Sequence, residues 1–135
     1  MENQEILFKL SMFEQQLQQL QQQLQAVENG ITELNSLSLG LNELPGSKGK
    51  EIFARIGRGI YAKAKIISED LVVNVGENNF VKRSVPETKK MIEEQTVKLK
   101  EVGKELESNI ESVSSDFTKL AQEYEAGKEK EGNRH

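Results

Sequence analysis

Two glycine-rich segments are the first places where residue types and spacing could bind a phosphate group. GRGIYA, residues 57–62, fits the Gly-x-Gly-x-x-Ala pattern of a dinucleotide-binding loop, and GSKGKE, residues 46–51, contains part of a phosphate-loop pattern. The first pattern binds a pyrophosphate only where it opens a helix after a strand, and the second needs a Gly-Lys-Ser/Thr ending. Here Ile60, Ala62 and Ala64 alternate as in a strand. We therefore interpret the two segments as a β-turn and a loop, and we expect no cofactor.

Side chains for nucleophilic or metal chemistry are sparse. The single histidine, His135, ends the polar segment KEKEGNRH, and there is no cysteine. Zinc sites, triads and thiol dyads need more of these residue types than the chain contains. Carboxylate pairs such as Glu93 with Glu94 and Glu101 with Glu105 fall on charged, solvated stretches of a predicted helix. We therefore predict neither an enzyme nor a metal site.

Composition narrows the class of protein further. Of 135 residues, 36% are hydrophobic and 5% aromatic, which favours an elongated fold over a thick globular core. The net charge of -4 argues against a nucleic-acid partner. The N-terminus lacks a signal-peptide pattern, and no run of apolar residues is long enough to span a membrane. These features predict a cytoplasmic protein with no membrane partner.

The glutamine-rich stretch EQQLQQLQQQLQ, residues 14–25, carries leucines spaced three and four apart. This spacing is the heptad rhythm of a coiled coil, and glutamine is a good helix former for its outer face. The rhythm extends in both directions and predicts a buried seam on one helix. Its members are Ile6, Leu10, Phe13, Leu17, Leu20, Leu24, Val27, Ile31 and Leu34.

A second long helix is predicted from Pro86 onward. Its apolar residues are Ile92, Leu99, Val102, Leu106, Ile110, Val113, Phe117, Leu120 and Tyr124. Most pair with the first seam so that position numbers add to 130, as antiparallel partners should. Val27 with Val102 adds to 129. The two successive steps of four from Val102 through Leu106 to Ile110 predict a small stutter, with Gly103 just off the seam. The pairing favours an intramolecular hairpin, although two chains could share it.

Between the helices the apolar period changes to two. Residues 52–66 predict one β-hairpin with a Gly57-Arg58-Gly59 turn, and residues 71–85 predict a second with a turn at residues 76–79. Two small hairpins leave open edges, so we expect them to pair with each other and with strands of further chains. The predicted oligomer interface consists of Ile52, Ile56, Ile60, Ala62, Leu71, Val73, Val75 and Phe80.

This order of elements resembles the two-hairpin alpha class of prefoldin subunits, of the archaeal type. The resemblance lies in the ELPG break, EIFARIGRGIYAKAKI and DLVVNVGENNFVKRSVPE, and it covers nearly the whole chain. It implies a hexamer of two alpha and four beta subunits, with a double β-barrel body and six projecting coiled coils. It further implies capture of unfolded proteins without ATP and delivery to a group II chaperonin.

An apolar patch lies outside the first seam, near the start of the helix. Phe8 and Met12 are four residues apart and therefore neighbours on a helix surface. From spacing alone, either the patch contacts unfolded clients or the C-terminal tail, with Tyr124, covers it. The resemblance, in which clients are held at the helix tips, favours the first interpretation. The predicted client-binding residues are Ile6, Leu7, Phe8, Met12, Leu120 and Tyr124.

The predicted fold class is α+β, a long antiparallel coiled-coil hairpin with two small β-hairpins between its helices. We expect one prefoldin-like domain over residues 1–135. It comprises a first helix at 1–44, hairpins at 50–85, a second helix at 86–126 and a polar tail at 127–135. The predicted function is that of a chaperone subunit. The alternative is a structural filament or scaffold protein of prefoldin type, in which the same strand edges polymerise without a client.

Overall fold

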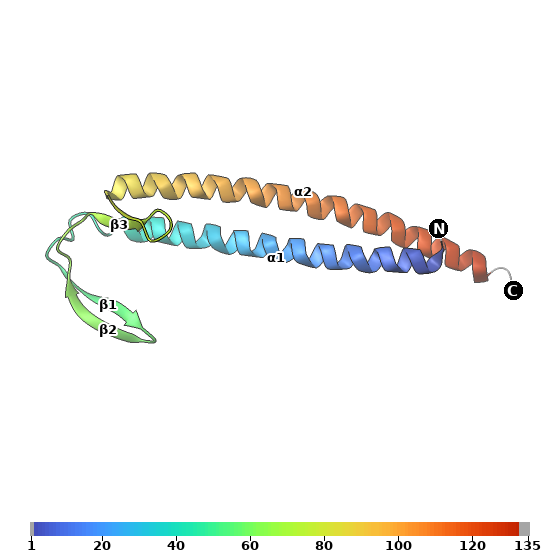
Figure 1. The fold of residues 1–135 in the computed structure, drawn as a ribbon, viewed down its shortest axis with the longest axis horizontal. Coiled ribbons are helices and arrows are strands. Elements are labelled where there is room, and N and C mark those ends of the chain that lie inside the picture. Colours follow the sequence, from blue (N-terminus) through green and yellow to red (C-terminus); the bar gives the residue numbers. More distant parts are fainter. Residues whose placement is uncertain (1, 133–135) are drawn as a thin grey trace. The chain divides into compact units, whose positions relative to one another are not determined.

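The computed structural model describes residues 2–132, with side-chain burial described up to residue 128. Along the chain, one long helix precedes two β-hairpins and a second long helix follows them (Figure 1). The elements are α1 (Asn3–Leu41), β1 (Glu51–Gly57), β2 (Ile60–Lys65), β3 (Leu71–Asn74), β4 (Phe80–Arg83) and α2 (Val85–Gly132). This arrangement confirms the predicted fold class.

The chain forms two compact units. One, which we call the helix-pair unit, consists of Met1–Gly30 and Leu99–His135, and so contains the first part of α1 and the last part of α2. The other, the hairpin unit, consists of Ile31–Lys98 and contains the end of α1, all four strands and the start of α2.

In the helix-pair unit, partly or fully buried side chains recur every three or four residues on both helices, which confirms the heptad rhythm. On α1 these residues are Asn3, Ile6, Leu10, Phe13, Leu17, Leu20, Leu24, Val27 and Gly30. On α2 the matching row is Leu99, Gly103, Leu106, Ile110, Val113, Phe117, Leu120, Tyr124 and Gly127. The glutamines between them on α1 face solvent.

The seam differs from the prediction at one place. Val102 is 44% exposed, whereas Gly103 is buried and its position faces Val27. Gly103 therefore takes the place assigned to Val102, and its pairing with Val27 restores the constant of 130. The spacing from Leu99 through Gly103 to Leu106 is regular, so the predicted stutter and the off-seam position of Gly103 are both wrong.

Each hairpin of the hairpin unit closes through two central turn residues with positive φ, as in a type I′ turn. These residues are Arg58 and Gly59 between β1 and β2, and Glu77 and Asn78 between β3 and β4. The right-handed twist of paired strands favours this turn. The predicted turns at residues 57–59 and 76–79 are therefore confirmed, and GRGIYA spans a strand end, a turn and a second strand.

The two hairpins are separate two-stranded sheets, with orders β1-β2 and β3-β4. The expectation that they pair with each other is therefore wrong for the residues that the structure describes. β3 and β4 have four residues each, against seven in β1 and six in β2. Such sheets retain open edges on both sides.

Local signals set the helix ends in the hairpin unit. Ser84 caps α2, because its Oγ accepts a hydrogen bond from the Glu87 backbone N–H at 3.2 Å. With Glu87 three residues on, this is the sequence pattern of a capping box. At the other end, α1 finishes with three backbone hydrogen bonds of the tighter i→i−3 type, from residues 42, 43 and 44.

A small apolar cluster holds this unit together. Leu41, Val85 and Ile92 are buried, and Leu34, Leu44 and Leu71 pack against them. Burying side chains of this size contributes about 2 kcal/mol each. The cluster thereby ties the end of α1, the start of α2 and β3 to one another.

Element bounds differ modestly from the predicted ones. The helix α1 ends at Leu41 rather than residue 44, and α2 begins at Val85 and continues to Gly132, past the predicted end at residue 126. Most of the segment predicted as a polar tail is thus helical. His135 lies outside the described residues.

Candidate functional site

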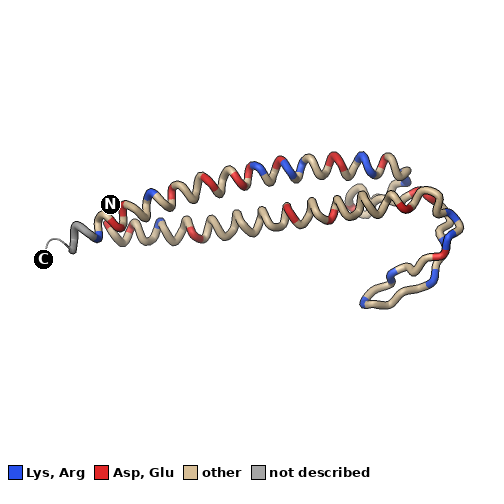
Figure 2. Tube along the Cα trace, turned by 180° about the vertical axis from the view of Figure 1, so that it is seen from behind, with Lys and Arg blue, Asp and Glu red and all other residues tan. Residues whose placement is uncertain are grey.

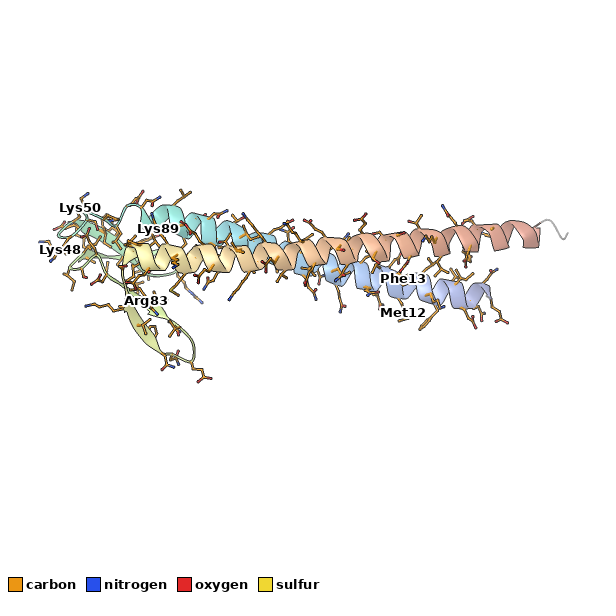
Figure 3. All side chains as sticks on the ribbon, turned by 90° about the horizontal axis from the view of Figure 1, so that it is seen from above. Met12, Phe13, Lys48, Lys50, Arg83 and Lys89 are labelled. Atoms are coloured by element: carbon orange, nitrogen blue, oxygen red, sulfur yellow. The ribbon has the colours of Figure 1, made fainter. Side chains whose placement is uncertain are left out.

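An exposed apolar patch lies near the N-terminal end of α1, within the helix-pair unit. Phe8 is 67% exposed and Met12 is 53% exposed, and Leu7, which precedes Phe8 in the chain, is also exposed. Figure 3 shows Met12 on the outer side of α1, whereas its neighbour Phe13 lies on the side toward α2. Large apolar side chains gathered on a polar helix surface are typical of an interaction site.

The other predicted client-binding residues belong to the seam. Ile6 and Leu120 are buried, and Tyr124 is half-buried, so these three hold the helices together beneath the patch. The alternative in which the tail covers the patch receives no support from residues up to 128, which leave Phe8 and Met12 exposed. We define the tip patch as Leu7, Phe8 and Met12.

In the first hairpin, the register brings apolar residues to one face. Ile52 pairs with Ala64, and Ala54 pairs with Ala62. Side chains of directly opposed residues share a face, so this face is wholly apolar. Ile52 and Ile60, although large, are exposed in the single chain. Such a face needs a partner.

Ile56 lies in an irregularity of the register between Arg55 and Gly57, where β1 carries one extra residue. A bulge of this kind twists the ladder and re-aims side chains. The sequence alternation did not anticipate it, because the closing turn determines it. Ile56 is 70% exposed and remains available as an interface residue.

The second hairpin is less exposed. Leu71 and Val73 are half-buried, with Leu71 against the core cluster, whereas Val75 and Phe80 are exposed. The structure also exposes Val72, which the sequence interpretation left out. Val72 belongs to the opposite face of β3, and its apolar character is the signal that could have identified it.

Two further aromatic residues, Phe53 and Tyr61, were not predicted as site residues. Both are exposed on the other face of the first hairpin, where they line one shallow hollow. They were left out because they alternate with the isoleucines and so lie on the face opposite the predicted interface. Two exposed aromatic side chains on a short hairpin are themselves typical of a surface that binds a partner.

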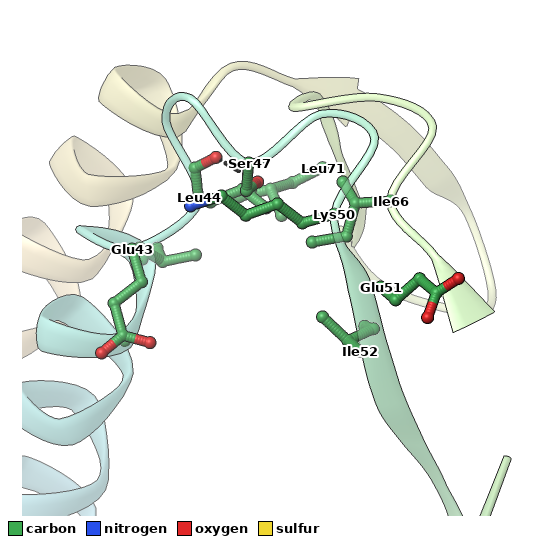
Figure 4. A pocket seen from close by; sticks show the side chains of 10 residues that line it. Glu43, Leu44, Ser47, Lys50, Glu51, Ile52, Ile66 and Leu71 are labelled. Atoms are coloured by element: carbon green, nitrogen blue, oxygen red, sulfur yellow. Dashed lines mark hydrogen bonds between the residues drawn. The ribbon is translucent and has the colours of Figure 1, made fainter. Parts of the chain in front are cut away.

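The hollow beside the end of α1 contains no arrangement for catalysis (Figure 4). Its ionisable side chains, Glu43, Lys50 and Glu51, sit among leucines and isoleucines, and the Ser47 hydroxyl donates a hydrogen bond to the backbone carbonyl of Leu44. Ser47 is therefore engaged in closing the turn. Among residues 2–132, no group of His, Cys, Asp or Glu side chains is arranged to hold a metal ion.

Neither α1 nor the described part of α2 contains a stretch long and apolar enough to cross a membrane.

Two long helices that flank a pair of β-hairpins define the prefoldin type of fold. The family model described as "Prefoldin subunit" matches residues 13–129. The chain therefore belongs to the prefoldin subunit family, a family of chaperone subunits rather than of enzymes, and its members assemble with one another as subunits.

Curated relatives place the chain near the alpha class. It is 27% identical over 122 residues to the prefoldin subunit alpha of Methanobrevibacter smithii, covering 90% of this chain and 84% of that one. It is 26% identical over 89 residues to the prefoldin subunit alpha of Methanosphaera stadtmanae, covering 66% and 64% respectively. The recognition of an alpha-class subunit from the sequence is therefore confirmed.

A solved structure supports the fold independently. The filamentous PFD of Methanocaldococcus jannaschii, determined by cryo-EM, superposes with a TM-score of 0.74 over 84% of this chain and 95% of that chain. The identity is 23%, so the likeness concerns the fold.

Proposed function

We propose that this protein is a chaperone subunit that binds unfolded or nascent proteins at the tip patch. The observation that carries the proposal is the exposure of Leu7, Phe8 and Met12 in the part of α1 that belongs to the helix-pair unit, where the other large apolar residues are half-buried or buried in the seam. Membership of the prefoldin family supports it. An unfolded client offers exposed apolar segments, and the flexible thioether of Met12 adapts to segments of different shape.

The patch suits weak and reversible binding. Three side chains on a convex helix surface form no deep pocket, so a single patch supplies little affinity. Several patches in one assembly raise the effective concentration of each for the same client, and the resulting avidity replaces a deep pocket. Such binding needs no ATP, because release follows from the weakness of each individual contact.

The apolar face of the first hairpin and the open strand edges supply the proposed means of assembly. Ile52, Ile56 and Ile60 would be buried against hairpins of beta subunits, together with Ala62, and Leu71, Val73, Val75 and Phe80 would extend the interface on the second hairpin. We propose a cytoplasmic hexamer of two alpha and four beta subunits. Its clients would pass to a group II chaperonin.

Client capture can be tested with the complex formed from this chain and a beta-class subunit. The double variant Phe8→Ser with Met12→Ser is expected to lose most suppression of aggregation of a denatured test protein, because it removes the two most exposed apolar side chains of the tip patch without touching the seam. Leu37→Ser with Leu39→Ser is a matched control, because it removes two exposed apolar side chains of the hairpin unit instead. Equal activity of the tip variant and the unmodified complex would refute the proposal.

A structural filament is the second candidate. It is favoured by the unpaired edges of both sheets and by the filamentous assembly reported for the similar archaeal structure. Electron microscopy of the chain without a beta subunit tests this function. Long regular filaments that do not suppress aggregation would favour it, whereas discrete particles that bind client would favour the chaperone.

A further inference from the structure

On the first hairpin, the face opposite the apolar one carries a regular pattern of aromatic and cationic side chains. Phe53 pairs with Lys63, and Arg55 pairs with Tyr61. The two aromatic side chains therefore occupy one diagonal of a square, and the two cations occupy the other. Phe53 and Tyr61 are 70% and 56% exposed, and Arg55 and Lys63 are exposed as well. We call these four residues the aromatic–cationic face.

This face lies in the most basic segment of an otherwise acidic chain. Residues 48–65 contain six cations and one carboxylate, Glu51, whereas the whole chain has a net charge of -4. Figure 2 shows Lys and Arg, in blue, along the β1–β2 hairpin. On the same face, Glu51 pairs with Lys65, so its charge is locally balanced and the other cations remain unpaired within the register.

The opposite face of the same hairpin determines which side stays accessible. It carries Ile52, Ala54, Ala62 and Ala64, and no charged residue. Under the proposed assembly, on which this inference rests, the wholly apolar face is buried against other subunits, since it gains most from leaving water. The aromatic–cationic face must then point away from the interior of the sheet assembly.

The charge pattern restricts what can bind there. Two copies of this face would bring Arg55 and Lys63 against the same cations, which disfavours self-association. Carboxylates are the complementary groups, since a guanidinium binds them through paired hydrogen bonds. The rings of Phe53 and Tyr61 would be covered by an apolar or aromatic side chain between those carboxylates.

We propose that the aromatic–cationic face is a docking surface for an extended acidic protein segment that carries apolar or aromatic side chains. A protein segment fits better than a nucleic acid, because a long polyanion would extend beyond the basic hairpin and meet a chain of net negative charge. A short acidic segment experiences chiefly the local cations, since screening confines the interaction to about 8–10 Å.

The test uses the assembled complex and a labelled peptide of about eight residues, which is long enough to run along strands of this length. The peptide alternates Asp or Glu with Phe or Leu, and binding is followed by fluorescence anisotropy. Arg55→Gln with Lys63→Gln, and separately Phe53→Thr with Tyr61→Thr, are each expected to weaken binding by about tenfold or more. Threonine preserves the strand preference, so the second variant removes the rings while retaining the hairpin.

Lys48→Gln with Lys82→Gln is the matched control, because it removes the same charge from the hairpin unit away from this face. It is expected to change the affinity by less than about threefold. Binding of the acidic peptide should also weaken as salt is raised. An equal loss in the control, equal affinity for a peptide with Asn and Gln in place of the acids, or tighter binding of a short oligouridylate would each overturn the proposal.

The outcome is separable from that of client capture. Variants of the aromatic–cationic face should keep the mass of the complex and its suppression of aggregation, and the tip variant should keep peptide binding. Loss of aggregation suppression in the tip variant alone, with peptide binding absent in every complex, would refute the docking surface and leave the proposed function standing. If the tip variant suppresses aggregation as well as the unmodified complex does, the proposed function is refuted and the docking surface is not.

Discussion

Val27 of α1 lies directly against Gly103 of α2. A Cβ built at position 103 would be 3.5 Å from Cγ1 of Val27, which is an ordinary van der Waals distance. The seam thus carries a glycine between Leu99 and Leu106, in addition to Gly30 and Gly127 at the ends of the two rows. Since glycine lowers helix stability relative to alanine and fills little space, position 103 contributes less to the stability of the helix pair than a larger residue could.

Gly103→Ala is therefore expected to stabilise the protein by about 1 kcal/mol, with a rise in melting temperature of about 4 °C at fixed subunit concentration. Gly40→Ala is the control for helix propensity alone, because a Cβ there meets nothing within 4 Å. Gly30→Ala should gain less than Gly103→Ala, since its Cβ would lie 3.2 Å from Leu99 Cδ1 and the leucine must shift. A larger gain at Gly30 than at Gly103 would contradict this account.

The same position shows how far the sequence could predict the fold. Apolar spacing identified both helices and nearly every member of the seam, because burial of one helical face depends on period alone. It selected Val102 over Gly103 because hydrophobicity favours valine. The regular alternation of steps of four and three along α2 instead places position 103 in the seam. Gly103 has no side chain, so hydrophobicity could not mark it, yet it is buried against Val27 of α1.

The candidate sites were less predictable. Phe8 and Met12 could be identified because they depart from the seam. Spacing placed Ile6 and Leu120 in the seam, where the structure buries them, although both were also predicted to bind clients. On the first hairpin, alternation suggested the apolar face. Which residues are direct partners, such as Phe53 with Lys63, depends on the register, and the closing turn sets that register.

Removal of the cap on α2 should weaken the hairpin unit. Ser84→Ala removes the hydrogen bond from the Glu87 N–H to Ser84 Oγ and is expected to cost about 1 kcal/mol of stability. Ser115→Ala, at an exposed position inside α2, is the matched control and should be neutral or slightly stabilising. Chemical denaturation of both variants provides the comparison. An equal effect at the two serines would show that the cap contributes nothing.

The turn between β3 and β4 offers a change of opposite sign. Glu77 has φ of 49°, a left-handed conformation that disfavours a side chain with a Cβ, so Glu77→Gly is expected to stabilise the hairpin by about 0.5–1 kcal/mol. Asn79→Gly, two residues on and without a positive φ, should instead destabilise by a similar amount, because it adds freedom to the unfolded chain. Hydrogen exchange of the β3 and β4 amides would measure both effects.

Phe8 and Phe13 provide a contrast between surface and seam on one helix. Phe8→Ser should change the free energy of unfolding by less than about 0.5 kcal/mol, because the ring is mostly exposed. Phe13→Ser should cost about 2 kcal/mol or more, because its half-buried ring packs in the seam. Thermal unfolding of the two variants would test this. A large loss at Phe8 would mean that the tip patch is structural, and the proposed client site would then fail.

The two faces of the first hairpin should respond oppositely in assembly. Ile52→Thr with Ile60→Thr is expected to release subunits, because the apolar face loses area that it would bury against other hairpins, at about 25 cal/mol per Å². Phe53→Thr with Tyr61→Thr changes the other face and should leave the assembly intact. Threonine is a strand former, so neither variant should unfold the hairpin itself.

Native mass measurement of each variant mixed with a beta-class subunit would distinguish the faces. If the isoleucine variant assembles normally while the aromatic variant dissociates, the assignment of the faces is reversed: Phe53 and Tyr61 would then be interface residues, and no acidic segment could reach them. If both variants dissociate, the sheet is covered on both sides, which requires a partner hairpin against each face. Only dissociation confined to the isoleucine variant agrees with an apolar face turned inward and a basic, aromatic face left open.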